Sequence, residues 1–549
     1  MKTEKNMKKL IVLLIIAGGL FYQPVQAQDL ESSKEAWVPD LGNGKYKNPI
    51  IFADYSDPDV CRVGDDYYLV ASSFDAVPGL PILHSKDLVN WTIIGHALMR
   101  HFPYDHFSKT QHGEGVWAPS IRYHNDSFYV YYGDPDFGIY MVRAKDPAGP
   151  WTKPFLVKAG KGLIDPSPLW DDKGKAYLVH AFAGSRAGIN NILTVTRMNS
   201  SGTKALGEGV IVYDGRGVDR TTEGPKFYKR NGYYYIFAPA GGVSHGYQIV
   251  LRSKNVYGPY QRKLVMHQGE TSINGPHQGG WVTTPDGEQS WFIHFRDMEA
   301  YGRVTYLEPM EWVNDWPVIG EDKDGDGVGE PVAIYKKPDV GQSYPLAVPQ
   351  TSDDFNDLKL GLQWQWQANP RSTWMFMTGN GTLRLYAQRL KEDKKNYWTF
   401  PSILMQKFPA DQFQVTTKLK FHPSNNGDKV GFMVMGEDYA YLSLTNKEGK
   451  LSLSFSTCEG AIDGNAEKVK TLGQIKDDII YFRVTVKEGA VCHFSYSLDG
   501  ENFEKVDATF TAKPGHWIGA KIGLFCSSIE QEHNSGYADF DWIRVRPVK

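Results

Sequence analysis

Three acidic residues, each in a turn-like context, are the part of this sequence best suited to chemistry. Asp57 lies in Tyr-Ser-Asp-Pro-Asp-Val, Asp165 in Leu-Ile-Asp-Pro-Ser-Pro and Glu223 in Thr-Thr-Glu-Gly-Pro-Lys. Each precedes a hairpin-like stretch rich in Asp, Gly and aromatic residues. Carboxylates at the same place in successive repeats are expected to point at one axis. Hydrolysis of a glycosidic bond needs two opposed carboxyl groups, one as acid and the other as base or nucleophile.

The repeat that carries these acids predicts a β-propeller. Between about residues 50 and 300, one pattern recurs five times: a polar turn, a strand-like run, a tight turn and a second, aromatic strand. Its anchors lie about 50 to 60 residues apart, a spacing that fits one four-stranded blade each; they are Asp57, Trp117, Asp165, Glu223 and His277. Because equivalent positions of the blades converge at one end of the central channel, we expect the three acids and His277 to share a pocket.

The rest of the chain predicts a second all-β domain. The propeller is expected over residues 28–332, followed by a linker over residues 333–350 that contains Pro338, Pro345 and Pro349. Residues 351–549 alternate apolar and polar side chains in short runs separated by hairpin turns. This pattern is typical of a two-sheet β-sandwich of the jelly-roll or concanavalin-like type.

Residues 1–27 read as a secretory signal peptide. Lysines at positions 2, 5, 8 and 9 precede an apolar stretch over residues 10–21, and Val-Gln-Ala at 25–27 is a small-residue cleavage site. The apolar stretch is shorter than the roughly 20 residues that span a bilayer. No cysteine lies near the cleavage site, and the first is Cys61. We therefore expect an exported, soluble protein, periplasmic or secreted, without a lipid anchor or membrane insertion.

Net charge and cysteine spacing give no indication of a nucleic-acid or membrane partner, a zinc site or a disulfide framework. The formal net charge of the 549 residues is −3, which gives no reason to expect a nucleic acid or an anionic membrane as partner. The four cysteines are widely spaced and form no CxxC pair, so neither a zinc site nor a disulfide framework is indicated. Free buried thiols are the favoured interpretation, with a pair among Cys458, Cys492 and Cys526 left open. Oligomeric state has no signal in the sequence.

Several short motifs, in a fixed order, carry a resemblance to a known family. They are Asn48-Pro-Ile, Ser56-Asp-Pro-Asp-Val, Gly79-Leu-Pro-Ile, His84-Ser-Lys-Asp-Leu-Val-Asn-Trp, Val116-Trp-Ala-Pro, Ile164-Asp-Pro-Ser, Thr222-Glu-Gly-Pro and Gly302-Arg. Taken together, they resemble glycoside hydrolase family 43, in its β-xylosidase and α-L-arabinofuranosidase branch. The likeness covers nearly the whole mature chain, because the C-terminal part resembles the β-sandwich that often follows this family's propeller.

The resemblance implies a role for each of the three acids. Asp57 would be the general base that activates water, and Glu223 the general acid that protonates the leaving oxygen. Asp165 would orient Glu223 and raise its pKa, since a neighbouring carboxylate disfavours ionisation. The family inverts configuration, which requires room for a water molecule between the sugar and the base.

Further residues match the family's sugar-binding positions. Phe74 and Trp117 stand where the family stacks a pentose ring, and Arg303 where an arginine hydrogen-bonds to sugar hydroxyls. His277 matches a channel histidine that commonly holds a water or a calcium ion, with a purely structural role as the alternative. Lys226 departs from the pattern, because family members often have histidine after Glu-Gly-Pro.

No redox or organic cofactor is required by this chemistry, but a structural calcium ion is an open alternative. Asp353 and Asp541 lie at the two ends of the sandwich, where paired terminal strands could bring them together at a calcium site. The acidic segment around Asp324 and Asp326 has oxygens at alternating positions, yet Ala333 stands where the loop's bidentate glutamate belongs. A solvated acidic turn and a metal loop both fit that segment.

The expected function is that of an exo-acting, inverting glycosidase. It would release terminal α-L-arabinofuranosyl or β-D-xylosyl units from plant hemicellulose or its oligosaccharides. The alternatives are an exo-hydrolase of arabinan or galactan side chains and a catalytically inactive carbohydrate-binding propeller; the intact Asp57, Asp165 and Glu223 argue against the latter. For the sandwich, a structural role that closes one side of the pocket is favoured over an independent sugar-binding module.

Overall fold

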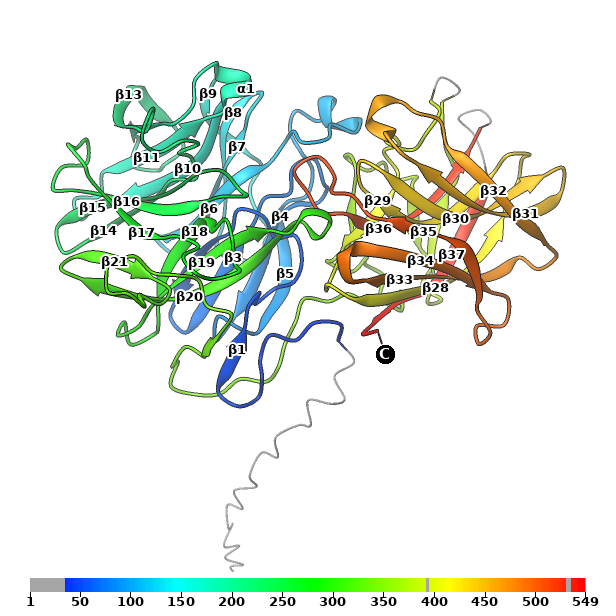
Figure 1. The fold of residues 1–549 in the computed structure, drawn as a ribbon. Coiled ribbons are helices and arrows are strands. Elements are labelled where there is room, and N and C mark those ends of the chain that lie inside the picture. The colour runs from blue at the N-terminus through cyan, green and yellow to red at the C-terminus, as the bar shows by residue number, and fades with distance from the viewer. Residues whose placement is uncertain (1–34, 392–393, 530–534, 549) are drawn as a thin grey trace, which may run out of the picture.

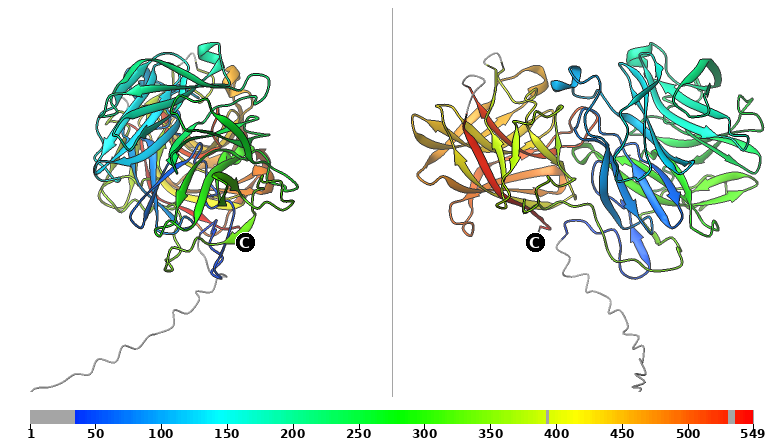
Figure 2. Two further views of the ribbon diagram at one scale, coloured as in Figure 1. Left: turned by 90° about the vertical axis from the view of Figure 1, so that its left-hand side faces the viewer. Right: turned by 180° about the vertical axis from the view of Figure 1, so that it is seen from behind.

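The protein is almost entirely β-structure and forms two units that lie side by side (Figure 1). The computed structural model describes residues 35–391, 394–529 and 535–548, so the expected signal peptide lies outside the described residues. An N-terminal propeller and a C-terminal sandwich remain distinct when the molecule is seen from behind (Figure 2). In the described ranges, the one α-helix is the single turn α1 (Gly184–Ala187). None of the helices there is long and apolar enough to span a bilayer.

Five antiparallel sheets of four consecutive strands form the propeller, which confirms the predicted fold. The first strand of a blade begins at Trp117 or His277, and within three residues of the anchor in the others. The blades are β2 (Asp59–Val63), β3 (Asp66–Val70), β4 (Gly79–Ser85) and β5 (Trp91–Leu98); β6 (Trp117–His124), β7 (Ser127–Asp134), β8 (Gly138–Ala144) and β9 (Phe155–Ala159); β10 (Leu163–Trp170), β11 (Ala176–Phe182), β12 (Ile192–Met198) and β13 (Ala205–Asp214); β14 (Lys226–Arg230), β15 (Tyr233–Ala240), β16 (Tyr247–Ser253) and β17 (Gln261–Met266); β18 (His277–Thr283), β19 (Ser290–Asp297), β20 (Arg303–Val313) and β21 (Trp316–Ile319).

Burial falls from the channel outwards, which explains the residue types of the strands. The first six residues of the inner strand β10 are buried, whereas most of the outermost strand β13 of the same blade is exposed. Inner strands are covered on both faces by neighbouring blades, so they tolerate continuous apolar runs. Between the third and fourth blades, Ile164 and Val179 share an apolar cluster with Phe227 and Ile236.

The segment before the first blade is hydrogen-bonded to the last blade and to the strand that follows it. Strand β1 (Lys45–Lys47) pairs with β22 (Ile334–Lys336), which follows the last blade, so the stretch predicted as a linker begins as a strand. The Tyr46 hydroxyl donates to the carbonyl oxygen of Leu307 at 2.8 Å. The Asn48 amide donates to the carbonyls of Leu307 and Val332, both at 2.8 Å. The chain before the first blade is thereby fixed to the fifth blade.

The sandwich consists of two sheets that pack on one apolar core. Alternation in β33 (Ile479–Lys487) buries Ile480, Phe482, Val484 and Val486, as the period-two pattern predicts. One sheet contains β23 (Gln365–Trp366), β27 (Leu404–Lys407), β36 (Lys521–Ser528), β29 (Lys429–Met435), β30 (Tyr439–Lys447), β31 (Lys450–Cys458) and β32 (Lys468–Ile475), with β26 (Gln388–Arg389) beside β36. The other contains β24 (Met375–Met377), β25 (Leu383–Tyr386), β37 (Tyr537–Arg546), β28 (Phe413–His422), β33, β34 (Val491–Ser497) and β35 (Glu504–Thr511).

The cysteines are unpaired. Cys458, Cys492 and Cys526 are buried in the sandwich, and Cys61 is partly exposed in the first blade. The favoured interpretation of free thiols is confirmed.

The core of the sandwich continues into the propeller. Phe52 and Tyr301 of the propeller belong to the same apolar cluster as Trp364, Trp366 and Phe408 of the sandwich. The two units therefore share one buried surface. Domains that are joined only by a linker need not pack against each other in this way.

Backbone hydrogen bonds also cross the boundary between the two units. The amides and carbonyls of Val77 and Trp366 exchange hydrogen bonds of 2.9 and 2.6 Å, as in a β-ladder. The Asn369 side chain accepts from the His101 amide at 2.8 Å and donates to the carbonyls of His101 and Tyr104 at 3.0 and 3.3 Å. These contacts specify one docking geometry, because hydrogen bonds are directional where apolar contacts are not.

The substitution Asn369→Ala should lower the free energy of unfolding by about 2–4 kcal/mol, because three hydrogen bonds are lost and buried backbone groups stay unpaired. The measurement is urea denaturation followed by circular dichroism. The matched control is Asn380→Ala, at an exposed position of the same domain, which should leave the midpoint in place. An Asn369→Ala midpoint equal to the wild type would mean that the two units unfold independently.

Candidate active site

Asp57 is held by hydrogen bonds from three side chains where the chain enters the first blade. Its carboxyl oxygen Oδ2 accepts from the hydroxyls of Ser56 and Ser72 at 2.8 and 2.6 Å. Arg303 Nη1 lies 3.2 Å from Oδ1. The Ser72 oxygen also accepts from the Ala118 amide at 2.8 Å, so its hydroxyl hydrogen is available to Asp57. These contacts fix the orientation of the carboxylate.

Two of the predicted acids have backbone conformations that side-chain-bearing residues rarely adopt. Asp57 and Asp165 have φ values of +52° and +56°, and each precedes a proline. The residue before proline normally adopts extended geometry, so a left-handed conformation there is doubly unusual. Strain of this kind persists where the surrounding structure enforces it, and such positions cluster at functional sites.

Asp165 and Glu223 meet through the backbone of the fourth blade. The Gly224 amide donates to Asp165 Oδ2 at 2.7 Å. Gly224 has a φ of +57°, and a Cβ there would lie 2.6 Å from Cγ of Gln278, so only glycine fits. The Asp165 residue is 2% exposed, whereas 27% of the Glu223 side chain is accessible. Of the two acids, Glu223 is therefore the one that a substrate can reach.

The surroundings raise the pKa of Glu223. Burial among protein groups is the largest cause, and the negative charge of Asp165 adds to it; Arg303 acts in the opposite direction. Burial also raises the pKa of Asp165, but the Gly224 hydrogen bond and the charges of Lys226 and Arg303 oppose that shift. Within the described chain, Glu223 has no donor hydrogen-bonded to its carboxyl group. We therefore assign the proton that this pair retains to Glu223.

Lys226, the departure from the family pattern, is fully buried in the channel wall. Its ammonium group donates to the Pro119 carbonyl at 2.7 Å and to the Ser120 hydroxyl at 3.2 Å. Burial lowers its pKa, while the negative charges of Asp59, Asp165 and Asp57 oppose that shift. The charge of Lys226 in turn opposes the rise in the pKa of Asp165 that burial causes.

His277 lies next to Glu223, as the repeat predicted. Its Nε2 is 3.7 Å from Glu223 Oε1, and its side chain is inaccessible to solvent. Burial, together with the nearby charges of Arg303 and His294, lowers its pKa to about 3, so the ring is neutral. Neither ring nitrogen has a hydrogen-bond partner among the described residues. These orphaned nitrogens fit a small polar channel ligand such as water; calcium would need oxygen ligands that His277 does not offer.

Aromatic side chains form one wall of the pocket. Trp117 is held by a hydrogen bond of 2.8 Å from its indole nitrogen to the Gly113 carbonyl. The Phe74 ring lies edge-on to it, with centroids 6.3 Å apart, and Phe74 is 3% exposed. The larger accessible aromatic surface on this side therefore belongs to Trp117. Arg303 contacts Asp57, and Trp517 lies within 6.3 Å of both Trp117 and Arg303, so the predicted binding residues lie near that acid.

Trp517 of the sandwich is a site residue that the sequence did not reveal. It lies in the loop over residues 512–520, between β35 and β36, which reaches across to the propeller (Figure 1). Its ring centroid is 6.3 Å from that of Trp117 and 6.0 Å from Cζ of Arg303. The residue is 48% exposed and has a φ of +67°. The sandwich thereby supplies one side of the pocket.

The proposed calcium ligands of the sandwich already have protein partners. Asp353 accepts hydrogen bonds from the Trp364 indole and the Phe355 amide, both at 2.9 Å. Asp541 forms an ion pair with Lys418 at 2.5 Å. Neither belongs to a group of three potential ligand atoms within the described ranges. The one such group found there is the exposed turn formed by Asp322, Asp324 and Asp326, whose carboxylates accept from amides of the same turn.

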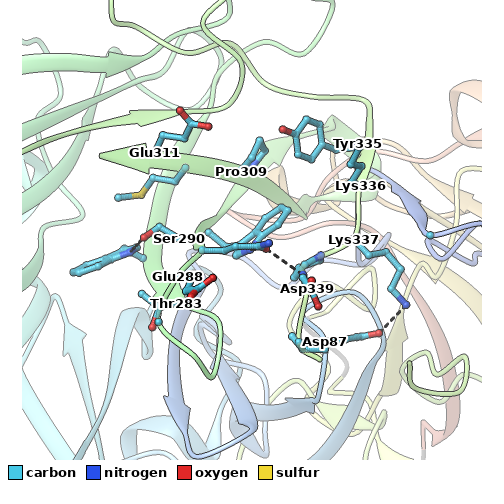
Figure 3. Close-up of a pocket in the computed structure, with 18 of the residues that line it drawn as sticks. Asp87, Thr283, Glu288, Ser290, Pro309, Glu311, Tyr335, Lys336, Lys337 and Asp339 are labelled. Carbon is cyan, nitrogen blue, oxygen red and sulfur yellow. Dashed lines mark hydrogen bonds and ion pairs between the residues drawn. The ribbon is translucent and has the colours of Figure 1, made fainter. Parts of the chain in front are cut away.

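A cavity of about 1210 Å³ lies elsewhere, around the turn between β18 and β19. Thr283, Ser290, Pro309, Glu311 and Tyr335 are among its lining residues (Figure 3). His277 begins β18, whereas this turn lies at the opposite end of that strand. None of the predicted acids lines this cavity. We therefore locate the candidate active site at the three acids and not at this cavity.

Comparisons with known proteins agree with this geometry. Residues 46–317 match the model of glycosyl hydrolases family 43, and residues 352–546 match the beta xylosidase C-terminal concanavalin A-like domain. A putative beta-xylosidase of Xylanibacter ruminicola is 38% identical over 512 residues, covering 92% of this chain and 91% of its own. The non-reducing end alpha-L-arabinofuranosidase BoGH43B of Bacteroides ovatus is 31% identical over 534 residues, covering 92% of this chain and 96% of its own.

Solved structures give the same result for the fold. The xylan beta-1,4-xylosidase of Bacillus halodurans superposes with a TM-score of 0.80 at 26% identity, covering 91% of this chain and 99% of its own. The GH43B protein of a Bacteroides ovatus xyloglucan locus superposes with a TM-score of 0.76 at 28% identity, covering 92% of this chain and all of its own. Family models match both domains, and relatives of 31% and 38% identity align over nine-tenths of the chain, so the protein belongs to glycosyl hydrolase family 43 and is a glycosidase.

Proposed function

We propose that this glycosidase is an exo-acting, inverting enzyme that removes single terminal α-L-arabinofuranosyl or β-D-xylosyl units from plant hemicellulose or its oligosaccharides. The observation that carries the proposal is that Arg303 and Asp57 are close enough to Glu223 for their charges to act on its raised pKa, while Arg303 also contacts Asp57 at 3.2 Å. The names of the relatives, beta-xylosidase and non-reducing end alpha-L-arabinofuranosidase, support the substrate class. The segment over residues 1–27 supports export.

The proposed mechanism uses this chain's own side chains and one water molecule. Asp57 takes a proton from the water as its oxygen attacks the anomeric carbon, and Glu223 gives a proton to the leaving glycosidic oxygen. Asp165 keeps Glu223 protonated through its negative charge. Arg303 fixes the orientation of Asp57 and presents its remaining N–H groups to sugar hydroxyls. An ion or water at His277 would support the channel without taking part in proton transfer.

Exo-action is supported by the walls of the pocket. Trp117 closes one side from the propeller, and Trp517 approaches it from the sandwich. A pocket bounded by both domains suits a chain end better than the middle of a polymer. Arabinan or galactan side chains are the alternative substrates, and chromatography of the sugar released from arabinoxylan, arabinan and xyloglucan oligosaccharides distinguishes them.

Asp57→Ala and Glu223→Ala should each lower kcat on an unactivated oligosaccharide by about 10²–10⁴-fold, because each removes one proton-transfer group. The thermal midpoint should remain close to that of the wild type. The matched control is Asp172→Ala, which removes a largely exposed carboxylate in an outer turn and should retain full turnover. Near-normal rates in either active-site variant would refute the assignment.

Glu223→Ala should lose far less activity on a substrate with an activated aryl leaving group than on an unactivated oligosaccharide. A nitrophenolate leaves with little protonation, so the general acid contributes little to that reaction. The measurement compares kcat/KM of the variant and the wild type on both substrates. Equal losses on the two substrates would show that Glu223 is not the acid.

Asp165→Asn should move the alkaline limb of the kcat/KM profile to lower pH. The negative charge of Asp165 raises the pKa of Glu223, so neutralising it lets Glu223 lose its proton at lower pH. A shift of one pH unit corresponds to about 1.4 kcal/mol. Asparagine keeps an oxygen that can accept from the Gly224 amide. An alkaline limb that stays in place or moves upward, in an otherwise active variant, would contradict this role.

A further inference from the structure

We propose that Asp54 is a positioning residue that couples the sandwich loop over residues 512–520 to Arg303, so that domain docking sets the geometry of the pocket. The inference rests on the proposed function for its kinetic readout. Asp54 is 3% exposed. Its Oδ1 accepts from the Arg303 amide at 2.9 Å, and its Oδ2 accepts from the Gly519 amide at 3.0 Å. One carboxylate therefore joins two backbone segments that belong to different domains.

The backbone around this carboxylate is built for close approach. Gly302 has a φ of +76°, and a Cβ there would lie 2.6 Å from Cγ of Asp54. A Cβ at Gly519 would lie 2.7 Å from the Gly302 nitrogen. Next to this contact, the Ala520 amide donates to the Ala300 carbonyl at 2.7 Å. Two glycines thus let the loop and the strand entrance meet directly at Asp54.

A carboxylate suits this position better than an amide does. Both partners are N–H donors, and an ionised aspartate offers two acceptor oxygens and no donor. Asparagine of the same shape would satisfy one amide and turn an N–H group towards the other. Because the carboxyl group has no other hydrogen-bond partner among the described residues, that mismatch would weaken the link between the loop and Arg303.

From Asp54, the coupling reaches the reacting groups in two directions. On the propeller side, Arg303 Nη1 contacts the Ser56 hydroxyl at 3.0 Å and the Asp57 carboxylate at 3.2 Å. On the sandwich side, Gly519 follows Trp517 by two residues. Trp517 is half exposed and has a left-handed backbone, and the hydrogen bond from Gly519 to Asp54 anchors its loop two residues further along. Its place over Arg303 and Trp117 depends on how the loop is anchored.

A control at Asp87 separates the proposed positioning role of Asp54 from a general contribution to stability. Asp87 is a second buried carboxylate of the propeller, 2% exposed, and it forms an ion pair with Lys337 at 2.9 Å. It lies in the turn between β4 and β5, at the opposite end of the first blade from Asp57. Loss of either carboxylate should lower stability, but only loss of Asp54 should change substrate binding.

The test measures kcat and KM on a nitrophenyl pentoside for the full chain and for Asp54→Asn, Trp517→Ala, the double variant and the control Asp87→Asn. Asp54→Asn should raise KM about tenfold with a smaller change in kcat, because misplaced substrate-positioning groups weaken productive binding. Trp517→Ala should raise KM as well. The KM of the double variant should not exceed that of the single variant with the higher KM, as for residues that act as a unit. Asp87→Asn should leave KM unchanged.

A second variant keeps the proposal testable if Asp54→Asn does not fold. Gly519→Ala retains the carboxylate but places a Cβ against the backbone of Tyr301 and Gly302, which moves the loop away. It should raise KM in the same way and be non-additive with Trp517→Ala. An unchanged KM in Asp54→Asn and Gly519→Ala, or effects that multiply with that of Trp517→Ala, would overturn the coupling. A wild-type chain without pentosidase activity would instead overturn the proposed function.

Discussion

Every feature of the pocket depends on placing three carboxyl groups close together in a buried site. Burial, together with the negative charges of neighbouring carboxylates, raises the pKa of Glu223 and of Asp165. The hydrogen-bond donors around the three carboxyl groups are unequal. Asp57 receives two hydroxyl donors and a guanidinium, and Asp165 receives a backbone amide. Glu223 receives none of these and keeps its proton. Chemically identical groups thereby acquire different protonation states from their surroundings.

The propeller was predictable because its constraint is periodic. Each blade needs an inner strand, and the start of that strand recurs at or near Asp57, Trp117, Asp165, Glu223 and His277. Radial repetition then places those positions at one end of the channel without any further information. The same reasoning predicted that Asp57, Asp165, Glu223 and His277 share a pocket. In the structure, His277 lies 3.7 Å from Glu223, and the Gly224 amide next to Glu223 donates to Asp165. The alternating pattern of strands such as β33 likewise sufficed to predict the sandwich.

The remaining site residues follow from tertiary contacts that leave no periodic trace. Ser72 lies two residues after the second strand of the first blade and reaches Asp57 only because the hairpin folds back. Trp517 lies in an irregular loop of the other domain, and its place beside Trp117 depends on how the domains dock. The calcium hypothesis for Asp353 and Asp541 used chain position alone. In the structure, Asp353 accepts from an indole and Asp541 pairs with an ammonium group, and the calcium site stays a prediction.

Docking of the domains and construction of the pocket use the same short segments. Phe52 and Tyr301 enter the apolar cluster shared with the sandwich, while Asp54 and Arg303, two residues further along each segment, enter the polar site. A shift of either segment that relieved strain in the apolar contact would therefore move the guanidinium that orients Asp57. Because packed interiors transmit displacement instead of absorbing it, stability of the interface and precision of the acid–base pair are one structural requirement. This accounts for a sandwich that packs on the propeller through a shared apolar cluster.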